Sequence, residues 1–193
     1  MMIVLIRPEC PNPKALVNKN YKDLENKEAL RKSTAGKCMY CESKIEHISY
    51  AHVEHIKPKK KFPELEFVWD NLGFSCQVCN TNKWEKYDET TPFINPYSEK
   101  PENYIVFMDF YVYSIGSSER SEYTINELQL NRAGLVERRK ERYDKIKFLI
   151  NAADHTSNDY LRNQIINELK TESNKDKEYS AMIKSVLIDK DIL

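Results

Sequence analysis

The chain reads CMYC at residues 38–41 and CQVC at residues 76–79. In each stretch two residues separate two cysteines, a spacing that lets one tight turn present both sulfurs to one metal ion. A four-thiolate site is closed to water and substrate, so we expect its zinc to be structural. The alternative is that one pair is coincidental or redox-active. The sequence therefore predicts one tetrahedral zinc site with the ligands Cys38, Cys41, Cys76 and Cys79.

The segment between the two cysteine pairs carries the reactive side chains. The stretch HVEHI at residues 52–56 alternates polar and apolar residues at first. Pro58 should end this strand, because proline cannot donate to a β ladder. A second strand leads to Cys76, and a short helix is expected over residues 80–87. The predicted order is strand, long turn, strand and helix.

Four motifs follow one another between residues 37 and 86: Cys-x-x-Cys, acid-His-Ile-x-Pro, Asn-Leu and Cys-x-x-Cys-Asn-x-x-Lys. This order resembles the HNH endonuclease family, which has a ββα-metal fold. Many members carry Asp where this chain has Glu54, and the longer side chain moves the carboxylate by about one methylene. The resemblance implies Glu54 as a ligand of a catalytic ion, His55 as the general base, Asn71 as the residue that braces the loop, Asn80 as the second ligand of that ion and Lys83 as a phosphate contact.

The chemistry of these residue types agrees with phosphodiester hydrolysis. The reaction needs a base that deprotonates water and a cation that neutralises charge on the phosphate and the leaving oxygen. A neutral imidazole such as His55, with an ordinary pKa of about 6.5, suits the first task. Oxygen ligands from Glu54 and Asn80 suit Mg²⁺ or Mn²⁺. Three interpretations of His52 stay open: a third metal ligand, a phosphate contact, or an exposed polar residue.

Basic and aromatic residues flank the reactive strand. The lysines that follow it could neutralise phosphates beside the cut, although a run of charge is also typical of a solvated loop. Trp69 and Trp84 are expected to pack around the zinc loops, and His47 and His155 to be ordinary surface or packing residues. The candidate nucleic-acid contacts are Lys57, Lys59, Lys60, Lys61 and Lys83.

Composition limits the class of protein. The 193 residues suffice for one domain with a sizeable core, or for a small module with a helical extension. Thirty basic residues balance thirty acidic residues, so any contact with nucleic acid must come from a local patch. No apolar run is long enough to span a bilayer, no signal peptide is recognisable, and the cysteine pairs suit a reducing compartment. We therefore expect a cytoplasmic protein.

The fold class predicted is α+β: a zinc-stapled ββα-metal HNH module with a mainly helical C-terminal extension. Residues 1–36 should form an N-terminal strand and helix, and residues 37–90 the nuclease module. Residues 91–193 should begin with one or two strands between 104 and 113, and these should be followed by amphipathic helices near 132–153, 160–169 and 179–187.

Outside the HNH core, the chain is similar to the HNH subunit of Septu-type and retron-associated anti-phage systems. The similarity lies in Ile6-Arg7-Pro8, in Asn95-Pro96-Tyr97 and in the pattern of residues from Ile125 to Arg139. It implies an ABC/SMC-like ATPase partner that docks on the C-terminal helices, and DNA as the substrate. The alternative function is a noncatalytic zinc-ribbon adaptor that binds nucleic acid or protein. The alternative role of the helices is the core of a helical cap.

Overall fold

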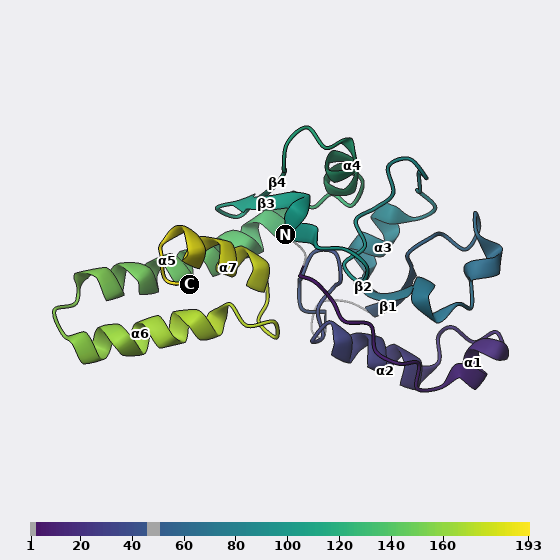
Figure 1. Ribbon diagram of the computed structural model, residues 1–193, viewed down its shortest axis with the longest axis horizontal. Helices are drawn as coiled ribbons and strands as arrows, with labels where there is room; N and C mark the ends of the chain where they lie inside the picture. Colours follow the sequence, from purple (N-terminus) through teal and green to yellow (C-terminus); the bar gives the residue numbers. More distant parts are fainter. Residues whose placement is uncertain (1–2, 46–50) are drawn as a thin grey trace.

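The computed structural model describes residues 3–45 and 51–193, so the predicted role of His47 lies outside the described residues. A small antiparallel sheet of β1 (Ala51–His55) and β2 (Leu72–Cys76) lies beside α3 (Gln77–Lys83). At the other end of the molecule, a long helical hairpin extends away from this module (Figure 1). The α+β class, the module of two strands and a helix, and the helical C-terminal region are as predicted.

Backbone pairing fixes the order of the reactive residues on β1. Glu54 lies opposite Gly73 and His55 opposite Leu72, so the end of β1 meets the start of β2. Helix α3 begins at Gln77, earlier than the expected start at residue 80, because the Cys76 thiolate caps it and accepts from the backbone N–H of Cys79 at 3.4 Å. The second cysteine pair therefore lies at the start of α3, with Cys76 as its N-cap and Cys79 in its first turn.

The N-terminal region packs against this module. Helix α1 (Pro13–Val17) was not predicted, because Pro13 reads as a turn residue although it is well suited to a first helical turn. Helix α2 (Leu24–Ser33) falls within the predicted range and starts at Asp23, whose carboxylate caps it. The apolar run at residues 3–6 is an extended segment rather than a strand, and its Leu5 N–H donates to the Pro96 carbonyl at 2.8 Å.

A second two-stranded sheet and a helix connect the module to the C-terminal region. Strands β3 (Ile105–Met108) and β4 (Tyr111–Ser114) form a hairpin that turns at Asp109, whose φ is 53°. Helix α4 (Glu119–Glu127) follows and was not predicted. Short 3₁₀ turns complete the connections: Pro63–Leu65, Trp69–Asn71 and Pro101–Asn103.

Three helices form the C-terminal region, close to the predicted ranges. Helices α5 (Ala133–His155) and α6 (Asp159–Glu172) lie antiparallel, and α7 (Ser180–Asp189) returns toward β3 (Figure 1). Arg139 of α5 is buried and donates to the Leu130 carbonyl at 2.8 Å. No helix in the described part of the chain is long and apolar enough to cross a membrane. The division into three domains stays a prediction.

A buried ion pair joins the turn of the first cysteine pair, residues 38–41, to the C-terminal region. The Lys37 ammonium lies 2.8 Å from a Glu42 carboxylate oxygen, and both side chains are almost fully buried. Lys37 also donates to the Lys177 carbonyl at 2.9 Å and to the Ser180 hydroxyl oxygen at 3.0 Å. Residues distant in sequence thus meet around one buried ammonium group.

Replacing Lys37 with methionine should destabilise the protein strongly, because Glu42 would remain as a buried charge without its cation. The expected loss is about 3–5 kcal/mol of unfolding free energy, measured by urea denaturation. Lys140→Ala, which breaks the exposed pair between Lys140 and Asp144, is the control and should cost less than about 0.5 kcal/mol. Equal losses in the two variants would contradict the role given to the buried pair.

Candidate active site and zinc centre

The four paired cysteines come together in the fold. Their sulfur atoms all lie within 4.8 Å of one another, and all four residues are buried. The Sγ atoms of Cys41 and Cys76 are 3.9 Å apart. Tetrahedral zinc with Zn–S bonds of about 2.3 Å places its sulfurs about 3.8 Å apart. The four side chains therefore fit a tetrahedral zinc ion. They would fill all four ligand positions, so none would remain for water or substrate.

Backbone hydrogen bonds form the turn of the first cysteine pair, residues 38–41, and attach it to the sheet. The N–H of Cys38 donates to the Ser43 carbonyl at 2.9 Å, and the N–H of Met39 donates to the Phe74 carbonyl of β2 at 2.9 Å. Gly73 makes this close approach possible, because a Cβ atom there would lie 2.4 Å from the Met39 sulfur. The zinc turn and the reactive strand pair thus form one packed unit.

An arginine side chain also lies at the cysteine cluster. Arg132 precedes α5, and its Nη1 is 3.8 Å from the Cys79 sulfur. Burial by itself lowers the pKa of Arg132, but the negative charge of Cys79 and Cys41 outweighs burial and raises it. Four thiolates around Zn²⁺ carry a net negative charge, and Arg132 offsets part of it at the start of α5.

Loss of one ligand should remove the metal and the structure that it holds. We expect about one zinc per chain in the purified protein and none in Cys41→Ser, measured by elemental analysis. The variant should also lose its cooperative thermal transition. Cys10→Ser is the matched control, because Cys10 is half-buried and lies outside the cluster. Zinc retained by Cys41→Ser at the wild-type level would refute the four-thiolate site.

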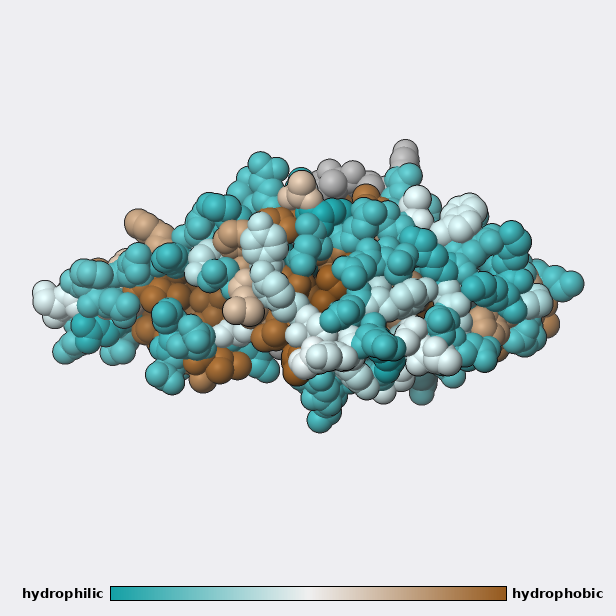
Figure 2. All heavy atoms as spheres, turned by 90° about the horizontal axis from the view of Figure 1, so that it is seen from above, coloured by the Kyte–Doolittle hydropathy of each residue, from teal (hydrophilic) through white to brown (hydrophobic). Residues whose placement is uncertain are grey.

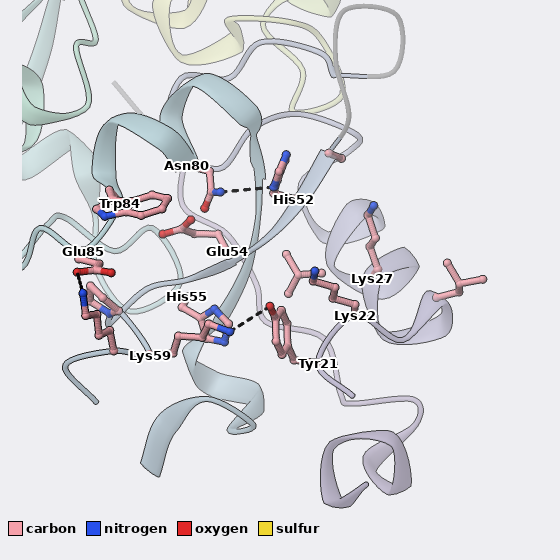
Figure 3. A pocket seen from close by; sticks show the side chains of 15 residues that line it. Tyr21, Lys22, Lys27, His52, Glu54, His55, Lys59, Asn80, Trp84 and Glu85 are labelled. Atoms are coloured by element: carbon pink, nitrogen blue, oxygen red, sulfur yellow. Dashed lines mark hydrogen bonds and ion pairs between the residues drawn. The ribbon is translucent and has the colours of Figure 1, made fainter. Parts of the chain in front are cut away.

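A cleft of about 460 Å³ contains the proposed reactive residues. Glu54 and His55 line it from β1, and Asn80 lines it from α3 (Figure 3). His52 lies two residues before Glu54 on β1 and also lines the cleft. The strand places His52 and Glu54 on the same face, and the helix that follows β2 places Asn80 beside them.

The Glu54 carboxylate is buried and paired with a lysine. Its Oε1 lies 2.7 Å from the Lys83 ammonium, which also donates to the His55 carbonyl at 2.7 Å. Burial raises the pKa of Glu54, whereas the charge of Lys83 lowers it. Lys83 was expected to contact a phosphate, but only about 1% of its side chain is exposed. In this structure the lysine holds the proposed metal ligand instead.

The imidazole of His55 is fixed on two sides. Its Nε2 lies 3.0 Å from the Glu66 carbonyl, and its ring packs edge-on against Tyr21 with centroids 4.6 Å apart. Because a carbonyl can only accept, this bond places the proton on Nε2 and leaves Nδ1 as an acceptor. Burial lowers the pKa of His55, although the bond to Glu66 acts in the opposite direction. The ring is therefore neutral near pH 7.

Asn71 ties together the two ends of the loop that leaves β1. Its Oδ1 accepts from the backbone N–H of Lys57 at 2.7 Å, and its Nδ2 donates to the carbonyls of Lys57 and Leu65 at 3.0 and 3.1 Å. These three bonds hold the chain immediately after His55 and shape the loop from which Glu66 reaches His55.

His52 and Asn80 contact each other at the upper end of the cleft. The Asn80 amide nitrogen lies 3.4 Å from His52 Nδ1 (Figure 3). Burial lowers the pKa of His52, and the charges of Lys27 and Lys22 lower it further. A neutral His52 accepts from the Asn80 amide and leaves the amide oxygen for another partner.

The lysines after β1 are partly occupied by other groups. Lys59 pairs with Glu66, and Lys60 pairs with Glu85, each at 2.9 Å. Lys61 donates to the Tyr87 carbonyl at 2.9 Å. The Lys57 ammonium lies over the rings of Phe62 and Tyr87, at 5.2 and 5.8 Å from their centroids. Of these four lysines, Lys59 and Lys60 line the cleft.

The structure brings further residues to the cleft that no motif indicated. Tyr21, Lys22 and Lys27 reach it from the N-terminal region, which the sequence places far from β1. Trp84 was expected to pack around the zinc loops, but it is 68% exposed at the rim of the cleft. Trp69 is half-buried and donates from its ring nitrogen to the Pro8 carbonyl at 2.8 Å.

The paired strands, the helix and the cysteine frame define a class of protein. The model of the HNH endonuclease family matches residues 38–86, which contain all of these elements. The chain is a nuclease of the HNH endonuclease family.

Individual relatives show which members of the family this chain resembles. The chain is 30% identical to the Septu protein PtuB of Bacillus thuringiensis over 182 residues, which cover 84% of this chain and 68% of that protein. It is 31% identical to the Septu protein PtuB of Bacillus mycoides over 62% of this chain and 51% of that protein. A Vibrio cholerae protein named for retron Vc95 and HNH endonuclease activity is 29% identical over 67% of the chain and 68% of that protein. The chain belongs with the Septu PtuB proteins in this family.

Proposed function

We propose that the chain is a Mg²⁺- or Mn²⁺-dependent endonuclease that hydrolyses phosphodiester bonds of DNA. The observation that carries the proposal is the fixed His55 imidazole. Its Nε2 is held by the Glu66 carbonyl, so Nδ1 is available as a base in a cleft that also contains Glu54 and Asn80. A structural Zn²⁺ bound by the four cysteines holds this cleft in shape.

In the proposed reaction, His55 Nδ1 takes a proton from a water molecule as the water oxygen attacks phosphorus. The bond between phosphorus and the leaving oxygen breaks, and that oxygen keeps the bonding electron pair and takes a proton from solvent water. A bound Mg²⁺ or Mn²⁺ supplies positive charge for the phosphate and the leaving oxygen. The tie between Asn71 and the loop after β1 supports His55 in position.

Two oxygen ligands from this chain suit such an ion. Glu54 and Asn80 offer a carboxylate and an amide oxygen on the same side of the cleft, and His52 orients the Asn80 amide. Lys83 supports the role of Glu54, because a buried carboxylate without a cation tends to become protonated. The second carboxylate oxygen has no partner recorded among the described residues and is left for the ion.

The nearby lysines supply a surface for the phosphates beside the cut. Lys59 and Lys60 line the cleft, and their pairs with Glu66 and Glu85 are partly exposed. Such pairs are weak in water, so a phosphate can replace the carboxylate as the partner of the ammonium group. Lys57 and Lys61 extend this basic loop away from the reactive residues.

Replacing His55 with alanine should abolish cleavage and leave the fold intact. Plasmid DNA would be incubated with the zinc-loaded chain and Mn²⁺, and nicked and linear products would be measured by gel electrophoresis. Loss of a general base is expected to slow cleavage by at least about 100-fold. His155→Ala, at the exposed end of α5, is the matched control and should cleave as wild type does.

Metal-dependent cleavage by His55→Ala at the wild-type rate would refute the assignment of the base. If the wild type fails to cleave DNA with Mg²⁺ or Mn²⁺ but binds it, the chain acts as a noncatalytic adaptor instead.

We also propose that the protein works in the cytoplasm as the nuclease subunit of an anti-phage complex that an ABC/SMC-like ATPase regulates. Similarity to Septu PtuB proteins supports this role. The region from residue 91 to the end of the chain offers a docking surface, because apolar side chains gather at the end formed by α5 and α6 (Figure 2). Large exposed apolar residues on this hairpin are Phe148, Tyr160 and Leu161.

The partner proposal predicts a stable complex with an ATPase encoded beside this gene. Co-expressed proteins should elute together in size-exclusion chromatography, and Phe148→Ala combined with Tyr160→Ala should weaken the complex by at least about tenfold. Lys140→Ala, on an exposed part of α5, is the control. Separate elution of the wild-type proteins, or a complex that tolerates the double substitution, would contradict this docking surface.

A further inference from the structure

The wall of the cleft opposite α3 carries two positively charged side chains. Lys22 reaches the cleft from the segment before α2, and Lys27 reaches it from the first turns of α2 (Figure 3). Among residues 3–45 and 51–193, no carboxylate pairs with either ammonium group, in contrast to Lys59 and Lys60. Both positive charges also lower the pKa of His52. An anion in the cleft would therefore meet these two lysines without displacing an existing ion pair.

Trp84 lies on the side of the cleft opposite Lys22 and Lys27 (Figure 3). It ends α3 with a φ of 45°, an uncommon conformation for a residue with a side chain, and its indole is largely exposed. No ring contact is recorded for it within the described part of the chain. A large aromatic side chain that is held out at the rim of a basic cleft has the form of a stacking platform for a nucleotide base.

The reactive residues lie between these two features. Figure 3 shows Glu54 and His55 in the middle of the cleft, with Trp84 on one side and Lys22 and Lys27 on the other. A strand that crosses the cleft would meet the stacking surface, the reactive residues and the lysines in that order. The three parts come from α3, β1 and the start of α2, so the fold assembles them from separate segments.

We propose that the cleft binds a single-stranded nucleic-acid segment, with one unpaired base stacked on Trp84 and the phosphates beyond the cut held by Lys22 and Lys27. The inference rests on the proposed function in one respect: it takes Glu54 and His55 as the point of cleavage. Stacking on an exposed indole requires a base with a free face, which an intact duplex does not offer. Lys22 and Lys27 recognise the backbone and so add no base specificity.

Tryptophan fluorescence tests the stacking directly, because the chain has two tryptophans. Trp69→Phe leaves Trp84 as the sole emitter, and Trp84→Phe leaves the half-buried Trp69. Each full-length, zinc-loaded variant would be titrated with an oligothymidylate of about 12 nucleotides, without added divalent ions. Emission of Trp69→Phe should be quenched on binding, and emission of Trp84→Phe should not change.

Affinity measurements test the two walls separately. Trp84→Ala should weaken binding of the same oligonucleotide by roughly tenfold in fluorescence anisotropy. Lys22→Ala and Lys27→Ala should each reduce the slope of log affinity against log salt by about 0.7. Tyr113→Ala on β4 and Lys140→Ala on α5 are the matched controls, since they remove an exposed aromatic and an exposed basic side chain outside the cleft. Both controls should bind as wild type does.

Three results would overturn the inference: no binding of the single strand by the wild type, unchanged affinity in Trp84→Ala, or equal losses for a hairpin duplex and the single strand. Thermal melting and zinc content of each variant would exclude misfolding as the cause of a loss. Cleavage with Mn²⁺ is measured separately. Binding that quenches Trp84 without any cleavage would support the inference and contradict the proposed function. Cleavage by Trp84→Ala, Lys22→Ala and Lys27→Ala with wild-type affinity would support the proposed function and contradict the inference.

Discussion

The cysteine cluster is the constraint on which the rest of the structure depends. Four buried sulfurs within 4.8 Å of one another join the turn before β1 to the start of α3, and Arg132 brings the start of α5 to the same point. We expect metal binding at this cluster to supply part of the folding free energy of the module. None of the four cysteines lines the cleft, so we expect the cluster to act on the site only by holding β1, β2 and α3 together.

The cysteine cluster holds β1 in a position where charged and neutral side chains lie close together. Glu54 is buried, and Lys83 keeps a positive charge beside it, while His55 is buried enough to stay neutral. A carboxyl group and an imidazole thus lie next to each other at the end of β1. Lys22 and Lys27 add positive charge from a different segment, so a chain with no net charge acquires a local basic cleft.

Local spacing was enough to predict the zinc frame, the strand order and the long C-terminal helices, because each depends on residues close together in sequence. The environment of Lys83 could not be predicted, because its burial depends on Glu54, which lies on the neighbouring strand. Arg139 reads as part of an exposed basic face, yet the hairpin of β3 and β4 places Phe107 beside it. The positions of Lys22 and Trp84 at one cleft likewise arise only from packing.

We propose that a closed zinc site shapes a second site in which Glu54 and Asn80 bind a different divalent ion beside His55. Anomalous X-ray diffraction from crystals soaked in Mn²⁺, with data collected at the zinc and manganese absorption edges, tests this arrangement. We expect a zinc peak among the four cysteine sulfurs and a manganese peak between the side-chain oxygens of Glu54 and Asn80. Manganese at the cysteines, or none in the cleft, would contradict it.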